Sequence, residues 1–574
     1  MLRTLILSIS LVPFLSTAAE QQVLQPQFEI PDQSDAYEFK WAIKKVAIIG
    51  AGVSGLIAYR EFTGAGFERV RLFERDDVPG GNWHYTDETP VDAPIPNVDP
   101  VVGDFVPSLP PHCAPLPVEE HYHSGWEERW REHRSPKPVW ESLESVDPPP
   151  IQQITEIPWP QGTPWPLPHW TLARYLRAFA SFHGVNSNDA NPEVAYNTRV
   201  ERVEKHYDDA GREHGWTLTL KRLERTGLHS GKATWWTENF DAIVVATGRY
   251  NAPNIPSISG LEEWARKFPG SIIHSRQYRR PQPFINETIL VVGGAISGVE
   301  VTREINPTAR KVYQSVRPPN PHLPYDAVLV QLKRLPANVS VVPEIRRFHA
   351  SNASVELVNG TLLHGISRVI FATGFRYSFP FLPQFHNSSA SASPYSIVTD
   401  GTHLRSLHED FVYIDEPTIG FLNSMLPSTS STILNGDAVN WGGQTFTYAE
   451  YLSLALAKIW ARRAVLPGTT TLWQKYEERV KERGGYGRHL HYLGAGRATE
   501  KIRFFVAWLN DAAVKFGGRQ IDGESKDLPH ISAVWAQARY GAQRDSDYEN
   551  NVAYIHSNVI THDIAEAKPF PDEL

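Results

Sequence analysis

Three glycines near the start of the chain have the spacing of a dinucleotide-binding turn. They follow residues 46–49, a continuous apolar run typical of a strand buried on both faces. Gly50, Gly52 and Gly55 stand at GxGxxG spacing, which permits a tight turn, close approach of the backbone to a pyrophosphate, and close packing of the next helix. That helix, expected at residues 53–62, would point its free N–H groups at the phosphates.

A carboxylate stands where the ribose of such a nucleotide would lie. Residues 70–73 form a second apolar strand, which ends in Glu74. This position is about 20 residues after the glycines, the offset at which an acid holds ribose hydroxyls. The chain then reads GGNW at residues 80–83, where adjacent glycines permit close approach of the backbone to a cofactor.

A second signature, ILVVGGAISGVE, occupies residues 289–300. Gly293 and Gly298 take its outer glycine positions. Ala295 replaces the middle glycine, and its methyl group would move a pyrophosphate slightly outward without excluding it. The sequence therefore predicts two nucleotide sites.

The residues that end the second strand of each unit carry opposite charges. Residues 312–316 form the strand after the second signature, and Arg317 ends it as Glu74 ends the first. A carboxylate repels a 2′-phosphate, whereas a guanidinium binds it through charge-assisted bonds. We therefore expect the second site to prefer NADPH over NADH, with Arg310 or Lys311 as alternatives for the phosphate contact.

Two later strands indicate how the units are connected. Each ends in Ala-Thr-Gly, at residues 243–248 and 369–374. Two nucleotide folds, each tied to such a turn, predict an α/β protein in which one Rossmann-like domain is inserted into the other. The predicted segments are a signal peptide at 1–19, an N-terminal arm at 20–42, the first domain at 43–251 and 365–467, the inserted domain at 252–364, and a mostly helical extension at 468–574.

Residues 86–139 are rich in proline, histidine and acids and show no clear period, which predicts a long loop or an insertion. His121 and His123 lie in it, but no second ligand cluster accompanies them, so we interpret them as surface residues and predict no metal site. Helical spacing predicts helices at 170–183 and 446–465.

Composition excludes some classes of function. The 574 residues carry a formal net charge of −8, which gives no reason to expect a nucleic-acid partner. Cys113 is the only cysteine, so an intrachain disulfide is impossible. No apolar run reaches the length of a membrane span, and we expect a soluble protein with a small-molecule substrate.

Both ends of the chain carry targeting signals. The basic residue, short apolar run and small residues of the first 19 positions are typical of a secretory signal peptide. The chain ends in PDEL, which resembles an ER-retention tetrapeptide with its first position changed. We therefore expect the secretory pathway, either the ER lumen or secretion. Five sequons then predict glycosylation at Asn286, Asn338, Asn352, Asn359 and Asn387.

Between the two signatures, the chain resembles the flavin-containing monooxygenases. The family fingerprint FxGxxxHxxxY matches Phe268, Gly270, His274 and Tyr278. The order of first glycine turn, fingerprint, second glycine turn and FATG strand also matches, over about residues 43–467.

The resemblance implies FAD in the larger domain and NADPH in the inserted one. In that family NADPH reduces FAD, oxygen adds at the flavin as a 4a-hydroperoxide, and one oxygen atom passes to a soft nitrogen or sulfur nucleophile. It implies that His274 helps to position NADPH. The implied FAD contacts are Gly50, Gly52, Ser54, Gly55, Glu74, Gly81, Asn82 and Trp83. The implied NADPH contacts are Gly293, Ala295, Ser297, Gly298 and Arg317.

One position departs from the family pattern. Val146 stands where the family often has an asparagine near the flavin, and valine cannot donate a hydrogen bond there. The neighbouring Asp147 is expected to point elsewhere. Because of Val146, a flavin oxidase that releases peroxide is an alternative function. A Baeyer–Villiger enzyme, whose fingerprint ends in Trp where this chain has Tyr278, and a non-catalytic binding protein also stay open.

Overall fold

Two sheets organise the fold of this computed structural model, one mixed and one wholly parallel. The described residues are 33–111, 114–147, 149, 152–160, 162–164, 166–317, 331–387, 396–422, 430–434, 437–441, 445–491 and 494–521. The predicted signal peptide and the C-terminal tetrapeptide lie outside these residues, so both stay predictions.

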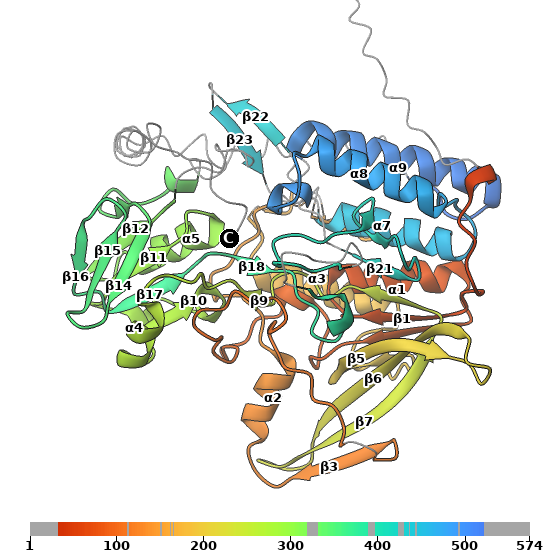
Figure 1. Ribbon diagram of the computed structural model, residues 1–574, viewed down its shortest axis with the longest axis horizontal. Coiled ribbons are helices and arrows are strands. Elements are labelled where there is room, and N and C mark those ends of the chain that lie inside the picture. The colour runs from red at the N-terminus through yellow and green to blue at the C-terminus, as the bar shows by residue number, and fades with distance from the viewer. Residues whose placement is uncertain are drawn as a thin grey trace, which may run out of the picture.

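The first sheet has seven strands in the order β19-β20-β21-β8-β1-β2-β4. At its centre β1 (Lys45–Ile49) pairs in parallel with β2 (Arg69–Phe73) and β8 (Ala242–Val245). Its remaining strands are β4 (Val194–Ala195), β19 (Leu407–His408), β20 (Val412–Tyr413) and β21 (Ile419–Phe421). The helix α1 (Val53–Ala65) begins directly after β1 and packs against α7 (Thr445–Trp460), as Figure 1 shows.

The second sheet has five parallel strands in the order β10-β17-β11-β12-β13. They are β10 (Ile272–His274), β11 (Thr288–Val292), β12 (Lys311–Ser315), β13 (Ser340–Val342) and β17 (Arg368–Phe371). The helices α4 (Leu261–Lys267) and α5 (Ile296–Ile305) and an antiparallel sheet of β14 (Ile345–His349), β15 (Ser354–Leu357) and β16 (Leu362–His364) complete this part. Figure 1 shows it in green at the left.

The predicted boundary at residue 365 is wrong. β17 follows that residue but pairs with β10 and β11, so it belongs to the second sheet. The chain returns to the first domain after Phe371, through β18 (Phe375–Arg376), which pairs antiparallel with the outgoing β9 (Ala252–Pro253). The sequence of an apolar strand followed by a glycine turn is the same whichever sheet the strand joins. The sequence pattern of β17 therefore does not reveal which strands it pairs with.

The segment 86–139, predicted as a long loop or an insertion, is not a loop throughout. The segment contains β3 (Val118–Tyr122) and α2 (Trp126–Arg134). β3 joins an antiparallel sheet in the order β3-β7-β6-β5, with β5 (Thr198–Tyr207), β6 (Glu213–Arg225) and β7 (Gly231–Phe240). Tyr122 is the one buried residue of β3. The strand therefore lacks the alternation of apolar and polar residues by which a strand is recognised in a sequence.

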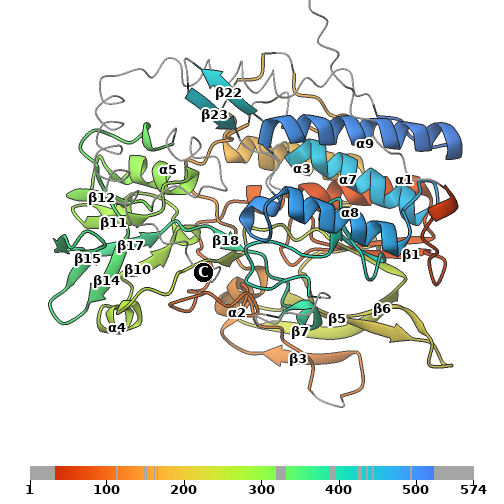
Figure 2. The same cartoon turned by 45° about the horizontal axis from the view of Figure 1, so that its top comes forward.

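Helices predicted elsewhere are present. α3 (His169–Phe182) is the helix expected at 170–183. The extension contains α8 (Thr469–Glu482) and α9 (Gly494–Phe516), which Figure 2 shows beside α7. The 3₁₀ helix η6 (Arg488–His491) connects them, and a hairpin of β22 (Ser430–Leu434) and β23 (Asp437–Trp441) precedes α7.

The extension and the N-terminal arm are fixed to the first domain by hydrogen bonds. The buried His491 bonds to the carboxylate of Asp410 at 2.7 Å and to the backbone of Leu404. Within the arm, the indole N–H of the buried Trp41 donates to the carbonyl of Asp241 at 3.0 Å. These contacts attach residues from both ends of the described chain to the same domain.

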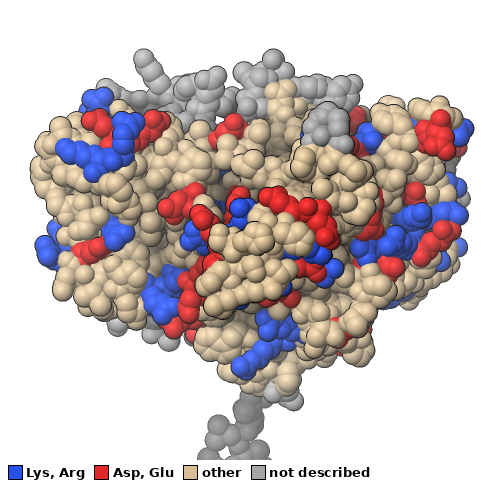
Figure 3. Space-filling view, turned by 90° about the horizontal axis from the view of Figure 1, so that it is seen from below, with Lys and Arg blue, Asp and Glu red and all other residues tan. Residues whose placement is uncertain are grey.

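The surface shows how the predicted modification sites and charges are distributed. Of the five sequon asparagines, all but the half-buried Asn387 are exposed. Acidic and basic side chains alternate over the face drawn in Figure 3, without a large patch of one sign. Within the described residues, no helix is long and apolar enough to cross a membrane.

Candidate active site

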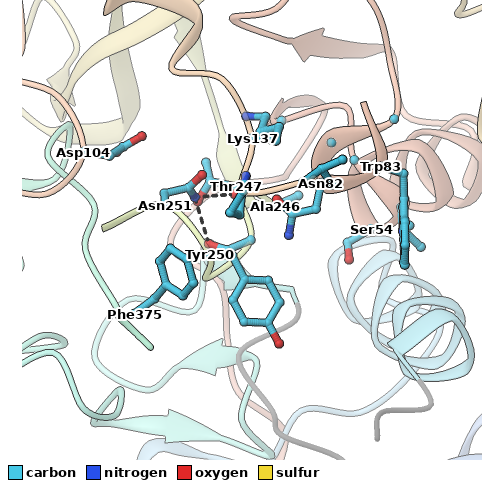
Figure 4. A pocket seen from close by; sticks show the side chains of 18 of the residues that line it. Ser54, Asn82, Trp83, Asp104, Lys137, Ala246, Thr247, Tyr250, Asn251 and Phe375 are labelled. Carbon is cyan, nitrogen blue, oxygen red and sulfur yellow. Dashed lines mark hydrogen bonds between the residues drawn. The ribbon is translucent and has the colours of Figure 1, made fainter. Parts of the chain in front are cut away.

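One cavity of about 400 Å³ extends from the first glycine turn to the start of α5. Gly52 and Gly81 line one end of it, and Ile296 and Ser297 line the other. Figure 4 shows Ser54 together with Asn82 and Trp83 on one side of the cavity. Most predicted FAD contacts therefore line the cavity, and they are joined by Ser297 of the predicted NADPH contacts. The other predicted NADPH contacts are not among its lining residues.

The two glycine loops of the first domain face each other across this end. A Cβ atom on Gly81 would lie 2.8 Å from the Cα of Gly52, and Gly81 has φ +54°. A Cβ atom on Gly52 would meet only Gly81, at 3.6 Å, so the space above Gly52 is open to a ligand. α1 begins at Gly52 without a side-chain cap, which leaves its N-terminal N–H groups for phosphate oxygens. These residues fit the pyrophosphate of FAD.

The outer glycines of the turn have a structural role. Gly50 has φ +104°, and a Cβ atom there would lie 2.7 Å from the carbonyl oxygen of Ala246. A Cβ atom on Gly55 would overlap the carbonyl oxygen of Gly50. Both positions therefore need glycine so that α1 can approach β1 and β8.

Glu74 lies in the cavity with its orientation fixed. One carboxylate oxygen accepts the N–H of Ala51 at 2.7 Å, and the other accepts the N–H of Asp76 at 2.9 Å. The side chain is buried at the carboxyl end of β2. Because each carboxylate oxygen has a further lone pair, this arrangement fits the ribose hydroxyls of FAD.

Sequence reasoning missed two charged residues that line the same cavity. Asp104 and Lys137 come from the segment that carries no motif, and Figure 4 shows both side chains. Arg75 donates to Asp104 at 2.7 Å. Burial, together with the nearby Arg75, lowers the pKa of Lys137 to about 8. Their place in the cavity is visible only in the folded structure, because no sequence motif marks either residue.

A cluster of possible metal ligands beside this end is part of an ion-pair network. Asp76, Asp77 and His84 place ligand atoms within 4.8 Å of one another. However, the guanidinium groups of Arg134 and Arg177 lie against the two ring nitrogens of His84, at 3.2 and 3.3 Å. Burial and these cations lower the pKa of His84 to about 4.

The second glycine turn repeats the geometry of the first. Gly293 has φ +120°, and a Cβ atom on Gly298 would overlap the carbonyl oxygen of Gly293. Ala295 is the exposed N-cap of α5, with φ −85° and ψ −177°. An alanine adopts this conformation without strain, so its presence does not prevent the turn from forming.

Arg317 lies where the sequence predicts, beyond the carboxyl end of β12, and is exposed. The alternatives Arg310 and Lys311 lie at the opposite end of that strand, about 20–23 Å away along an extended chain at roughly 3.3 Å per residue. Arg488 of the C-terminal extension is a closer cation. Burial lowers its pKa, and the positive charges of Arg317 and Arg376 lower it further.

The fingerprint histidine connects β10 with the turn that follows β17. His274 is fully buried, and its Nε2 donates to the carbonyl of Gly374 at 2.9 Å. Its Nδ1 accepts the N–H of Arg276 at 3.2 Å. Burial and the charge of Arg276 lower the pKa of His274 to about 3. The ring is therefore neutral at physiological pH and acts as a fixed hydrogen-bonding group.

The other fingerprint residues are structural. The ring of Phe268 packs against Trp264 with centroids 4.9 Å apart, and Gly270 has φ +73° in the turn before β10. Tyr278 is buried, and its hydroxyl donates to Glu304 at 2.8 Å. Sequence reasoning identified Tyr278 but not its partner.

Val146 lines the cavity, as its place in the sequence predicts. It also lines a small adjoining cavity of about 50 Å³. Asp147 is not among the residues that line either cavity, and burial raises the pKa of its carboxyl group to about 8. Leu143 and Phe446 add further apolar surface to the main cavity.

Comparisons with known proteins agree with this geometry. The Flavin-binding monooxygenase-like family matches residues 140–320, and a Rossmann-like NAD(P)-binding domain family matches residues 48–99. Flavin-containing monooxygenase iboF of Amanita muscaria is 52% identical over 539 residues, which cover 90% of this chain and 98% of that protein. Flavin-containing monooxygenase ustF2 of Aspergillus flavus is 28% identical and covers 81% of this chain and 92% of its own.

A solved structure has the same fold. S-allyl-L-cysteine S-oxygenase from Allium sativum superposes with a TM-score of 0.58 at 20% identity, over 90% of this chain and 98% of that one. Identity of this extent to iboF over nearly the whole of both chains shows the family. The chain belongs to the flavin-containing monooxygenases and is an FAD- and NADPH-dependent oxidoreductase.

Proposed function

We propose that this enzyme transfers one oxygen atom from O2 to a nitrogen or sulfur atom of a small-molecule or peptide-like metabolite. The observation that carries the proposal is the continuous cavity between the two glycine turns. Most contacts predicted for FAD line this cavity, together with Ser297, which is predicted to contact NADPH, and Val146. Electrons from NADPH and a substrate atom can therefore reach one flavin.

The protein's own residues bind the cofactors and exclude water. Bound FAD supplies the chemistry that passes electrons from NADPH to oxygen. Gly52, Gly81 and Glu74 would hold it, and the apolar side chains of Val146 and Phe446 would help to keep water out of the same cavity. This chemistry needs no side-chain nucleophile. S-oxygenation is carried by the same fold in the Allium sativum enzyme, as its name states.

Anaerobic reduction by NADPH followed by admission of oxygen tests the proposal. The flavin spectrum, NADPH consumption, peroxide and product mass are measured with a panel of amines, hydroxylamines, thioethers and thiols. A product heavier by one oxygen, formed in proportion to NADPH consumed, supports oxygenation. An ester formed from a ketone would support Baeyer–Villiger chemistry in its place.

A peroxide-releasing oxidase is the second candidate, and Val146 favours it because valine offers no hydrogen-bond donor in the cavity. We expect Val146→Asn to lower the ratio of peroxide to NADPH consumed by a few-fold, since an amide can donate where valine cannot. Val146→Leu is the control that keeps the site apolar. An unchanged ratio in Val146→Asn would remove the proposed role of this position.

We also propose that the enzyme works in the secretory pathway, in the ER lumen or after secretion. The support is the N-terminal apolar segment, the PDEL end and the sequons, four of whose asparagines are exposed. N-terminal sequencing of the protein from its native cells and a mobility shift after endoglycosidase treatment test this. An uncleaved N-terminus without glycans would contradict it.

A further inference from the structure

We infer that Glu304 is a positioning residue that fixes the segment 140–146 between the two nucleotide domains. The inference concerns electron transfer from NADPH, which belongs to the family reaction. It does not depend on which atom of which substrate is oxygenated. We call residues 140–146 the bridging loop, because their hydrogen bonds reach both domains.

Glu304 accepts three hydrogen bonds from two separate segments. The indole N–H of Trp140 donates to Oε1 at 2.8 Å, and the hydroxyl of Ser142 donates to the same oxygen. The hydroxyl of Tyr278 donates to Oε2 at 2.8 Å. A single carboxylate on α5 thus connects the bridging loop with the last residue of the fingerprint.

The same loop is attached to the first domain on its other side. The N–H of His169, at the start of α3, donates to the carbonyl of Leu143 at 2.9 Å. The N–H of Ser145 donates to the carbonyl of Leu167 at 2.7 Å. The loop therefore has bonds to each domain. On the NADPH side, the bonds from Trp140 and Ser142 to Glu304 add to a backbone bond from the N–H of Glu141 to the carbonyl of Arg279 at 2.9 Å.

The three hydrogen bonds to Glu304 stabilise a carboxylate that its place in the helix would otherwise disfavour. Glu304 lies in the last turn of α5, where the helix dipole disfavours a negative charge, so its three donors offset that cost. Trp140 and Tyr278 are buried, with ring centroids 6.3 Å apart in the core of the second domain. Removing the carboxylate would leave their buried N–H and O–H groups without an acceptor.

The position of the loop matters because it forms a wall of the main cavity. Leu143 and Val146 of the bridging loop line the cavity together with Ile296, the first residue of α5. Ile296 and Glu304 lie on the same helix, so the carboxylate fixes the loop relative to the N-terminus that faces NADPH. Glu304 would therefore help to set how bound NADPH lies relative to FAD, and a reaction between two bound groups loses rate when either is misplaced.

Glu304→Ala, Glu304→Gln and Tyr278→Phe test this inference in the FAD-loaded protein. We expect the limiting rate of anaerobic flavin reduction to fall about 10- to 100-fold in Glu304→Ala. The Kd for NADP+, measured by calorimetry, should change less than about threefold, and peptides of the bridging loop should exchange amide hydrogen faster. Glu304→Gln keeps one strong acceptor and should recover part of the rate.

Glu300→Gln is the matched control on the same helix, because Glu300 pairs with Arg303 and Arg334 inside its own domain. An equal fall in this control, or an unchanged limiting rate and exchange in holo Glu304→Ala, would overturn the inference. If Glu304→Ala does not fold, the limiting reduction rate and the amide hydrogen exchange of Tyr278→Phe and Glu304→Gln test the inference in its place. Reduction is measured without oxygen or substrate. The result therefore does not depend on whether an oxygenated product is found.

Discussion

The two glycine turns have almost the same backbone but different surroundings. Gly50 and Gly293 have φ of +104° and +120°. The N-caps of the following helices, Gly52 and Ala295, have φ, ψ of −77°, −171° and −85°, −177°. Because this backbone permits any residue at the N-cap, the first turn does not need glycine there for conformational reasons.

The difference lies in what faces each turn. Gly52 faces the backbone of Gly81, whereas Ala295 is exposed. At the ends of the second strands, Glu74 is buried and bonded to Ala51, whereas Arg317 is exposed. The turn thus indicates that a dinucleotide binds, and the residues around it decide which one and how tightly it is enclosed.

Gly52→Val gives the largest expected effect. The branched side chain fills the open space between Gly52 and Gly81 that the pyrophosphate needs, so purified protein should lack FAD. The absorbance ratio of flavin to protein measures this. Ala295→Val is the matched change at the second turn and should retain FAD. Stoichiometric FAD in Gly52→Val would refute the role assigned to the first turn.

Arg317→Glu tests the charge difference at the strand ends. If Arg317 pairs with the 2′-phosphate as predicted, its replacement should raise the KM for NADPH about 10- to 100-fold and that for NADH little, with FAD content unchanged. Lys311→Glu, at the far end of β12, is the control. An equal rise in KM for both coenzymes would show that Arg317 does not contact the 2′-phosphate. Arg488→Ala would then be the next variant to measure.

His274→Ala tests how the fingerprint holds the turn after β17. Loss of the bond to Gly374 should lower turnover about tenfold and leave FAD bound. With a pKa near 3 the wild-type ring stays neutral across pH 5–9, so the variant should keep the same pH profile of turnover. His274→Gln is the control with a retained donor. Loss of a titration step in the variant would show that the imidazole takes part in proton transfer.

Ala295→Gly gives the smallest expected effect. The alanine already has an allowed backbone and an exposed side chain, so glycine changes only the methyl group beside the pyrophosphate. The Kd for NADPH should shift by less than about threefold. A larger gain in affinity would mean that the methyl group limits how closely the coenzyme approaches.

The sequence by itself determined the local units of the site. Glycine at Gly50 and Gly55 is needed because a Cβ atom would collide with neighbouring backbone, and such requirements appear directly as residue type and spacing. The same holds for Glu74 and Arg317, whose distance from each turn is set by one helix and one strand. For this reason both nucleotide units and their strand-end charges were predictable.

Only the tertiary structure decided which distant segments complete the site. Lys137 and Asp104 come from a segment without a motif, Arg488 from the C-terminal extension, and Glu304 from an ordinary helical position. The sheet to which β17 belongs was likewise invisible. Sequence patterns report burial and conformation over a few residues, whereas these contacts join residues far apart in the chain whose types are common at any protein surface.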